Sequence, residues 1–537
     1  MHASGIHSVE LIVLVLLILV VALAALAKRL QTPYPLVLVI GGLILSLFRV
    51  GPRVELNPQL FFLVILPPLV FSAAALTPWR DFRYNLVSIM MLAFGLVAFT
   101  VFGVAAASRF ILPGFNWKMG LVLGAVVSTT DAIAATSIAH RLGLPKRITQ
   151  VLEGESLVND ATGLVALEFA IALLVTGHTP TVIEGIGRFL YLVFGSIVIG
   201  LVIGKLIHML ELKIIDAPIE ITIILIAPYF AYLAAEEARA SGVMATVACG
   251  LYLGHKSSLY LSRSARLTGD AVWDTLTFVL NGFVFLLIGF QLPYILAGIR
   301  THHLGGLILL GLMFSGVVIL LRFIWVYPGA AISYFIRRRF LHQNERLPSP
   351  QALFVVGWTG MRGVVALAAA MALPKEMQSG APVPERNVMI FLTFCVIFVT
   401  LVLQGLTLPP LIRRLGLCGT DPQNPEEEDA RRAMVEAALA YLEHSREEAE
   451  PDMVPVFDEL IRINRRRLDA LENVKPQDGS RPHDYQRWRD LTRQIAAIQR
   501  ATVLHLRNEN QINDETMRKL ERELDLTDAR LAGSDPG

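Results

Sequence analysis

The residues best suited to chemistry lie inside two apolar stretches of the sequence. The first contains S-T-T-D, which ends at Asp131, and the second contains G-E-S-L-V-N-D, which ends at Asp160. A charged side chain at the centre of a bilayer costs at least about 2.5–3.5 kcal/mol, so ionisable residues within a membrane segment indicate function. Clustered oxygen atoms, some of them titratable, suit the binding of a small cation and its exchange for a proton.

The spacing of the second motif predicts which side chains converge. On a helix, Glu155 and Asn159 share one face, and Ser156 and Asp160 share the adjacent face. The Ser156 hydroxyl and the Asp160 carboxylate can therefore bind one ion, and oxygen ligands without His or Cys favour Na⁺ or Li⁺ over a transition metal. A carboxylate that holds either a proton or a cation, but not both, would exchange one for the other. The alternative is that Asp160 only bonds neighbouring helices.

Two spans are predicted to be interrupted near these residues. Asp131 follows three hydroxyl residues at mid-span, and the segment G-W-T-G-M-R-G surrounds Arg362 in a later span. Such unwound backbone is tolerated in a membrane where it lines a cavity, and paired broken helices point to a transporter's binding site. We expect Arg362 to pair with Glu155. A direct role for Arg362 in transport is the alternative.

Membrane-spanning helices must position these residues. The chain has 537 residues, 54% of them hydrophobic, and its mean hydropathy is +0.56. Apolar runs of about 20 residues, each long enough to span the hydrocarbon core, recur along it. The first ten residues carry no Lys or Arg and show no small-residue cleavage site, which predicts that the first run is a retained span rather than a signal peptide. We predict an all-α polytopic membrane protein with about thirteen spans, at roughly 9–27, 34–49, 59–77, 87–112, 117–140, 150–176, 186–210, 218–236, 241–255, 272–298, 304–335, 351–373 and 387–412.

Charge predicts the orientation and a second domain. Most Lys and Arg residues between the spans lie in alternate loops, which places the N-terminus outside and the C-terminus in the cytoplasm. Residues 1–414 form the membrane domain, and 415–537 form a charged, net negative tail rich in helix-favouring residues. The tail is either a solvated appendage or a regulatory or dimer-contacting segment.

Several function classes are disfavoured. The sequence has no G-x-x-x-x-G-K-[ST] loop for ATP, and its three scattered cysteines form neither a disulfide framework nor a zinc motif. A secondary transporter or a channel therefore fits better than an ATP-driven pump or an enzyme. An intramembrane aspartyl protease would use Asp131 and Asp160 as a dyad, but the G-x-G-D context of that class is absent.

The motifs together resemble those of a known family. G-E-S-L-V-N-D, preceded by S-T-T-D and followed far downstream by G-M-R-G, is similar to the Na⁺/H⁺ exchangers of the cation:proton antiporter-1 family, which includes the bacterial NhaP-type antiporters and the animal NHE exchangers. The resemblance covers about residues 10–414. Further stretches agree with it: L-P-P-L-V-F at 66–71, A-E-E-A-R-A-S-G-V-M-A at 235–245, F-V-L-N-G-F-V-F-L-L-I-G at 278–289 and R-F-I-W-V-Y at 322–327.

The resemblance implies an architecture and an assembly. It implies a homodimer in the plasma membrane, built from two inverted repeats with crossed broken helices. A mobile core would comprise about 87–176 and 304–412, and a dimerisation part about 9–77 and 218–298. Monovalent cations and protons would be the substrates, and neither a cofactor nor a nucleic-acid partner is implied.

The resemblance also assigns roles to residues. Asp160 would carry the cation or proton, with Ser156 and the Thr130 carbonyl completing the Na⁺ shell and Asp131 acting through water. Asn159 would belong to the same ion- and proton-binding set. The Asn159–Asp160 pair matches the motif associated with electroneutral exchange, and Glu155 and Arg362 would form a structural ion pair. One departure is Ser72, where many members have a carboxylate that approaches the ion. The choice between Na⁺ and K⁺ therefore stays open, and a cation channel gated by the tail is a second function class.

Overall fold

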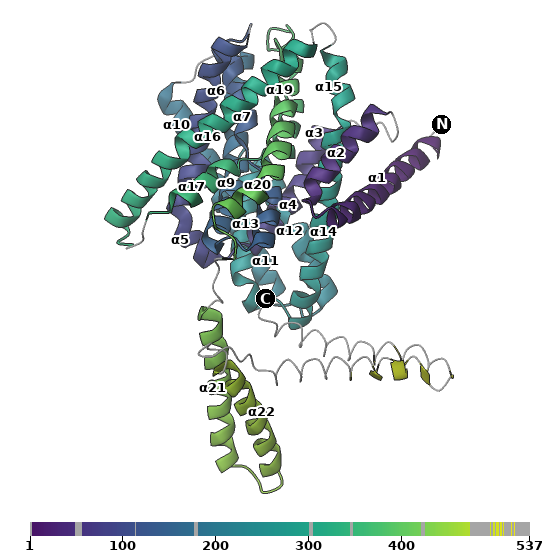
Figure 1. Cartoon of the computed structure of the whole chain (residues 1–537), viewed down its shortest axis with the longest axis vertical. Coiled ribbons are helices and arrows are strands. Elements are labelled where there is room, and N and C mark those ends of the chain that lie inside the picture. Colours follow the sequence, from purple (N-terminus) through teal and green to yellow (C-terminus); the bar gives the residue numbers. More distant parts are fainter. Residues whose placement is uncertain are drawn as a thin grey trace. The chain divides into compact units, whose positions relative to one another are not determined.

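The computed structural model is a helical membrane body followed by a helical hairpin. It describes residues 3–48, 56–112, 114–176, 181–299, 304–343, 347–419 and 425–472, together with scattered positions between 495 and 520. The described residues contain no β-strand, and ten helical segments are long and apolar enough to cross a membrane (Figure 1). The prediction of an all-α polytopic membrane protein is confirmed. The count of thirteen spans and the inverted repeats stay predictions.

The predicted apolar runs correspond to helices in the structure. Three of them fall outside the ten long segments, because α2 is short, α13 is less apolar and the run at 351–373 is divided into α17 and α18. The principal helices of the body are α1 (Ala3–Arg29), α2 (Tyr34–Leu47), α4 (Leu66–Leu76), α5 (Trp79–Met90), α6 (Val97–Ile111), α7 (Trp117–Ser128), α8 (Ile133–Leu142), α9 (Lys146–Thr176), α11 (Ser196–Glu211), α12 (Ala217–Glu237), α13 (Gly242–Tyr260), α14 (Arg263–Phe290), α16 (Leu304–Phe340), α17 (Pro350–Trp358), α18 (Val364–Met371), α19 (Arg386–Val399) and α20 (Gly405–Arg414). Short π-helical stretches connect α5 to α6 and α19 to α20 into single long segments.

Both interrupted spans are present where the sequence predicts them. Helix α7 ends at Ser128 and α8 begins at Ile133, while α17 ends at Trp358 and α18 begins at Val364. The two irregular segments touch, because the Asp131 backbone N–H donates to the Met361 carbonyl at 2.8 Å. Backbone groups freed by one break are thus partly satisfied by the other, which is what a low-dielectric interior requires.

Local sequence sets the ends of these half-helices. The Asn116 side chain accepts from the Met119 N–H at 2.9 Å and caps the start of α7, and Ser349 caps α17 ahead of Pro350. Helix α8 ends at Leu142 and is capped by Gly143, whose φ of +64° is the left-handed conformation that glycine adopts most readily. These residues fix the outer ends of the half-helices, opposite the breaks.

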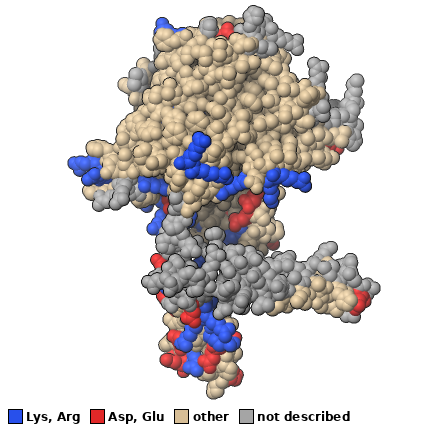
Figure 2. Space-filling view, in the orientation of Figure 1, with Lys and Arg blue, Asp and Glu red and all other residues tan. Residues whose placement is uncertain are grey.

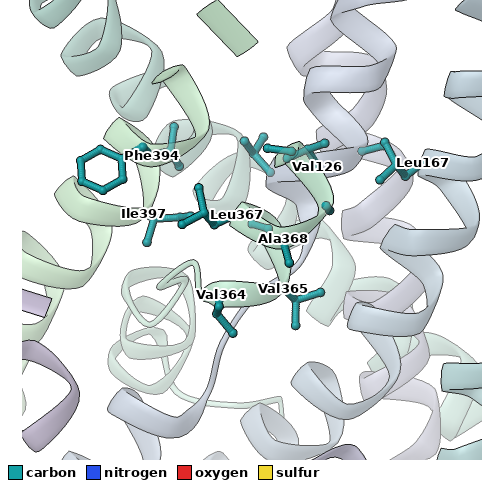
Figure 3. Close-up of a cluster of buried hydrophobic side chains, with 14 of the residues drawn as sticks. Val126, Leu167, Val364, Val365, Leu367, Ala368, Phe394 and Ile397 are labelled. Atoms are coloured by element: carbon teal, nitrogen blue, oxygen red, sulfur yellow. The ribbon is translucent and has the colours of Figure 1, made fainter. Parts of the chain in front are cut away.

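The apolar core of the body surrounds α18. Leu367 and Ala368 of this short helix are fully buried. Figure 3 shows them among side chains of α7, α9 and α19, which hold α18 in the middle of the body. The two breaks pack closely where they cross, a place called the crossing below, because a Cβ added at Gly363 would collide with the Asp131 side chain. Only glycine allows the second break to approach the first so closely.

The tail forms a separate compact unit that begins at Asp421. Its helices α21 (Pro425–Glu447) and α22 (Val454–Glu472) pack as a hairpin around the buried residues Leu439 and Ile461. Exposed ion pairs join the two helices, Arg446 with Asp458 and Arg465 with Glu443. Isolated surface pairs contribute little, so the apolar contact is the main stabilising feature.

Candidate functional site

Helix α9 lies beside the first break and fixes its backbone. The Ser156 hydroxyl donates to the Thr130 carbonyl at 2.9 Å and accepts from the Ala132 N–H at 3.2 Å. The Asn159 side chain accepts from the Thr130 N–H at 3.0 Å and donates to the Thr130 hydroxyl. The structure therefore brings together Ser156, Thr130 and Asn159, three of the residues expected at the site.

Asn159 makes two hydrogen bonds to Thr130 in this arrangement. Its amide binds both the N–H and the hydroxyl of Thr130, and the residue has no exposed surface. Asn159 therefore positions Thr130 at the first break. A second carboxylate at this position could not donate to the Thr130 hydroxyl, because an ionised carboxylate is an acceptor alone.

Asp131 caps the second half of the broken helix. Its Oδ1 accepts from the Ile133 N–H at 2.9 Å, and its backbone N–H binds the Met361 carbonyl. A carboxylate at the N-terminus of α8 is favoured by the helix dipole. The Oδ1 atom of Asp131 is thus bound to its own half-helix, α8, while Oδ2 takes no part in the cap.

Asp160 differs from every other acidic group at the crossing. It lies one turn after Ser156 on α9 and is partly exposed, and its carboxylate makes no hydrogen bond with any residue that the structure describes. Its charge interacts with those of Asp131 and Arg362. A carboxylate within a membrane span that has no fixed partner is available to bind a transported ion or proton.

The ion pair of Glu155 is formed with Arg322, and the expected pairing with Arg362 is wrong. Both nitrogens of the Arg322 fork donate to the two Glu155 oxygens, and both residues are 1% exposed. The Thr130 hydroxyl also donates to Glu155 at 3.2 Å, and Arg322 donates to the Val356 carbonyl of α17. The paired hydrogen bonds make Arg322, and not Arg362, the ion-pair partner of this carboxylate.

Arg362 instead joins the two breaks. Its Nη1 donates to the carbonyls of Ser128 and Thr129, at 2.8 and 3.0 Å, and its backbone N–H donates to the Thr400 hydroxyl. These carbonyls are the unsatisfied end of α7, where the helix dipole is negative and a cation is stabilising. Arg362 therefore neutralises a helix end and lies within electrostatic reach of Asp160.

Sequence reasoning missed Arg322 although a signal was present. The residue lies within the apolar run 304–335, and a charge there is as unusual as one at Asp160. Spacing along the chain does not show which of the two distant arginines, Arg322 or Arg362, faces Glu155. Ser72 is 5% exposed on α4, which packs against α9, and it makes no hydrogen bond with the described residues.

Comparison with known proteins identifies the family. Residues 15–414 match the family described as sodium/hydrogen exchanger, transmembrane. An uncharacterized Na⁺/H⁺ exchanger of Mycobacterium tuberculosis is 33% identical over 94% of this chain and 93% of its own length. The sodium, potassium, lithium and rubidium/H⁺ antiporter of Bacillus subtilis is 31% identical over 78% of this chain and 63% of that protein.

A solved structure shares the fold. The sodium proton antiporter MjNhaP1 of Methanocaldococcus jannaschii superposes with a TM-score of 0.62 at 19% identity, over 75% of this chain and 97% of that one. Likeness at this identity supports the fold alone. The family match over nearly the whole membrane body supports more, and together with the broken helices it shows that the chain belongs to the transmembrane sodium/hydrogen exchanger family.

Proposed function

We propose that this protein exchanges one Na⁺ or Li⁺ for one proton at Asp160. The observation that carries the proposal is that Asp160 has no hydrogen-bond partner among the described residues, although it lies in a membrane span beside an ordered set of oxygens. Glu155 and Asp131 are each held by other groups. Asp160 is therefore the carboxylate that is free to change its ligand.

The cation shell would use groups that are already oriented. Ser156 lies one turn before Asp160 on the same side of α9, and its hydroxyl donates to the Thr130 carbonyl, so these oxygens would lie near the Asp160 carboxylate. Asp160, Ser156 and the Thr130 carbonyl would bind the cation directly, with Asp131 acting through water. Hard oxygen ligands of this kind suit an alkali cation.

Exchange follows from the charge of Asp160. The protonated and the Na⁺-bound carboxylate are both neutral, whereas the empty carboxylate carries a charge whose burial is costly. The two loaded states would cross as the core, α5 to α9 with α16 to α20, moves against the remaining helices. One carboxylate that alternates between two monovalent ligands gives electroneutral exchange.

The protein would work as a homodimer in the plasma membrane, with the N-terminus outside. Support for this orientation comes from Lys and Arg side chains along the lower edge of the apolar body (Figure 2). Large apolar residues on α1, among them Leu11, Leu14 and Ile18, are 54–61% exposed and suit contact with lipid or a second subunit.

Two alternatives are distinguished by ion and by current. The Bacillus subtilis relative is named for potassium and rubidium as well as sodium and lithium. Ser72 also stands where the family resemblance implies a carboxylate near the ion. K⁺/H⁺ exchange at the same site is therefore the second candidate. A cation channel would produce unitary currents without a stoichiometric movement of protons.

The test uses purified protein in sealed liposomes that contain a pH-sensitive dye. We expect Na⁺ or Li⁺ to move protons in the wild type, with no effect of clamping the membrane potential, and to move none in Asp160→Asn. Asp270→Asn, which changes an exposed aspartate of α14, is the matched control and should transport normally. Full proton movement in Asp160→Asn would refute the assignment, and K⁺ as the better substrate would favour the alternative.

A further inference from the structure

A pocket of about 280 Å³ lies between the half-helix α17 and the last membrane helix α20, and Asp160 does not line it. It is lined by Phe354, Trp358, Thr407, Pro410, Leu411 and Arg414. Four of these six side chains are apolar or aromatic, and Arg414 alone among them carries a charge. The pocket thus combines an apolar slot with one positively charged side chain, that of Arg414.

The wall of the slot is built from ordered aromatic rings. Phe354 and Trp358 stack with an interplanar angle of 8°, and Phe323 of α16 packs against both, at centroid distances of 5.2 and 6.2 Å. The Trp358 indole N–H donates to the Thr407 hydroxyl at 2.9 Å. Both polar groups of the wall are therefore satisfied, and what faces the slot is apolar surface.

The rim of the pocket carries one positively charged side chain. Arg414 is the last residue of α20, is exposed, and forms no hydrogen bond or ion pair with the residues that the structure describes. Its neighbour Arg413 is also exposed and unpaired in that sense, but it does not line the pocket. Basic side chains along the lower edge of the body in Figure 2 mark the depth of the bilayer surface.

We propose that this pocket binds an anionic phospholipid, with an acyl chain in the aromatic slot and the headgroup phosphate on Arg414. The walls match hydrocarbon, and the charged lining group matches a net negative headgroup rather than a zwitterionic one. Basic pockets between membrane helices near the bilayer surface bind anionic headgroups in this way, and a guanidinium binds phosphate through paired donors.

The bound lipid would brace the transport core. Trp358 ends α17 and directly precedes the break that contains Arg362, while Thr407 belongs to α20. A chain held across these two residues would stabilise the packing of α17 on α20. The expected result is a higher thermal stability of the whole protein when anionic lipid is bound.

The test compares lipids on delipidated full-length protein in a neutral detergent. Phosphatidylglycerol should bind about fivefold more tightly than phosphatidylcholine in native mass spectrometry, and it should raise the melting temperature more. Arg414→Gln should abolish this preference, whereas the matched variant Arg413→Gln should keep it. Leu411→Trp, which fills the slot, should weaken the binding of both lipids.

Each other outcome overturns the proposal. Equal losses in the two arginine variants would show diffuse surface attraction rather than a site. Unchanged binding by a folded Leu411→Trp protein would show that no acyl chain enters the slot. Equal stabilisation by glycerol phosphate alone would show that the headgroup binds without the lipid, and equal binding of the two lipids to the wild type would remove the anionic preference.

Discussion

Replacing Arg322 by methionine tests the buried ion pair at the centre of the site. The substitution leaves the Glu155 carboxylate, which is 1% exposed, with the Thr130 hydroxyl as its remaining donor among the described residues. The Val356 carbonyl keeps a hydrogen bond from the Thr359 hydroxyl at 3.1 Å, so the main loss is the charge partner of Glu155. Removing one partner of such a pair costs about 3–5 kcal/mol of unfolding free energy.

A double-mutant cycle separates the interaction energy of Glu155 with Arg322 from the contributions of the surrounding residues. Glu155→Leu with Arg322→Met should be much less destabilised than the sum of the two single changes, because an apolar pair of similar volume leaves no uncompensated charge. We expect a coupling energy of about 3 kcal/mol or more between these two positions. The same cycle with Arg362→Met should give about 0.5–1 kcal/mol, because Arg362 binds carbonyls and not Glu155.

The assay is unfolding in mixed detergent micelles as a function of denaturing detergent, followed by tryptophan fluorescence. The reasoning is refuted if Glu155→Leu couples more strongly to Arg362→Met than to Arg322→Met. Equal coupling at the two positions would show a shared charge network, and the bidentate pair would then have no special role.

Three further changes test other contacts. Ser156→Ala removes one oxygen from the proposed shell, so the KM for Na⁺ in proteoliposomes should rise about two- to tenfold, whereas Ser137→Ala, which loses a hydroxyl bonded within α8, should leave it unchanged. Gly363→Ala forces a Cβ into the Asp131 side chain and should cost about 1–3 kcal/mol by detergent unfolding along with transport activity; Gly316→Ala, with open space around it, should not destabilise. In the tail, hydrogen bonds from Arg462 hold the pKa of the exposed Glu459 carboxyl below its ordinary value. The pair therefore adds helix stability above about pH 4.3 and loses it as the pH falls through the lower folded pKa, so circular dichroism of residues 421–537 should show an excess helicity over Glu459→Gln at pH 6 that vanishes near pH 2.

The spans and the breaks could be predicted because their signals are local. An apolar run of sufficient length predicts a membrane span by itself. The hydroxyl residues before Asp131 and the glycines around Arg362 predict the position of an interrupted helix to within a few residues. The Ser156–Asp160 face follows from helical periodicity alone. These features require no knowledge of which helices are neighbours.

Pairings between distant helices could not be predicted in the same way. Arg322 and Arg362 are both buried arginines in late spans, and the sequence does not show which one faces Glu155. The answer depends on the packing of α16 on α17 and of α17 on α9, which is set by the volumes of the side chains between them. The hydrogen bonds between Asn159 and Thr130 cannot be predicted from the sequence for the same reason, since they depend on how closely α9 approaches the first break.

The order of synthesis gives the Glu155–Arg322 pair a consequence for biogenesis. The two residues are 167 positions apart, and a ribosome adds about 5–20 residues per second, so α9 is made roughly 8–33 s before its arginine exists. During that interval the nascent chain must shelter Glu155 in the insertion machinery, near water, or in protonated form. A chain that terminates between α9 and Arg322 never acquires this partner, and it would present an uncompensated acid to the quality-control proteases of the membrane.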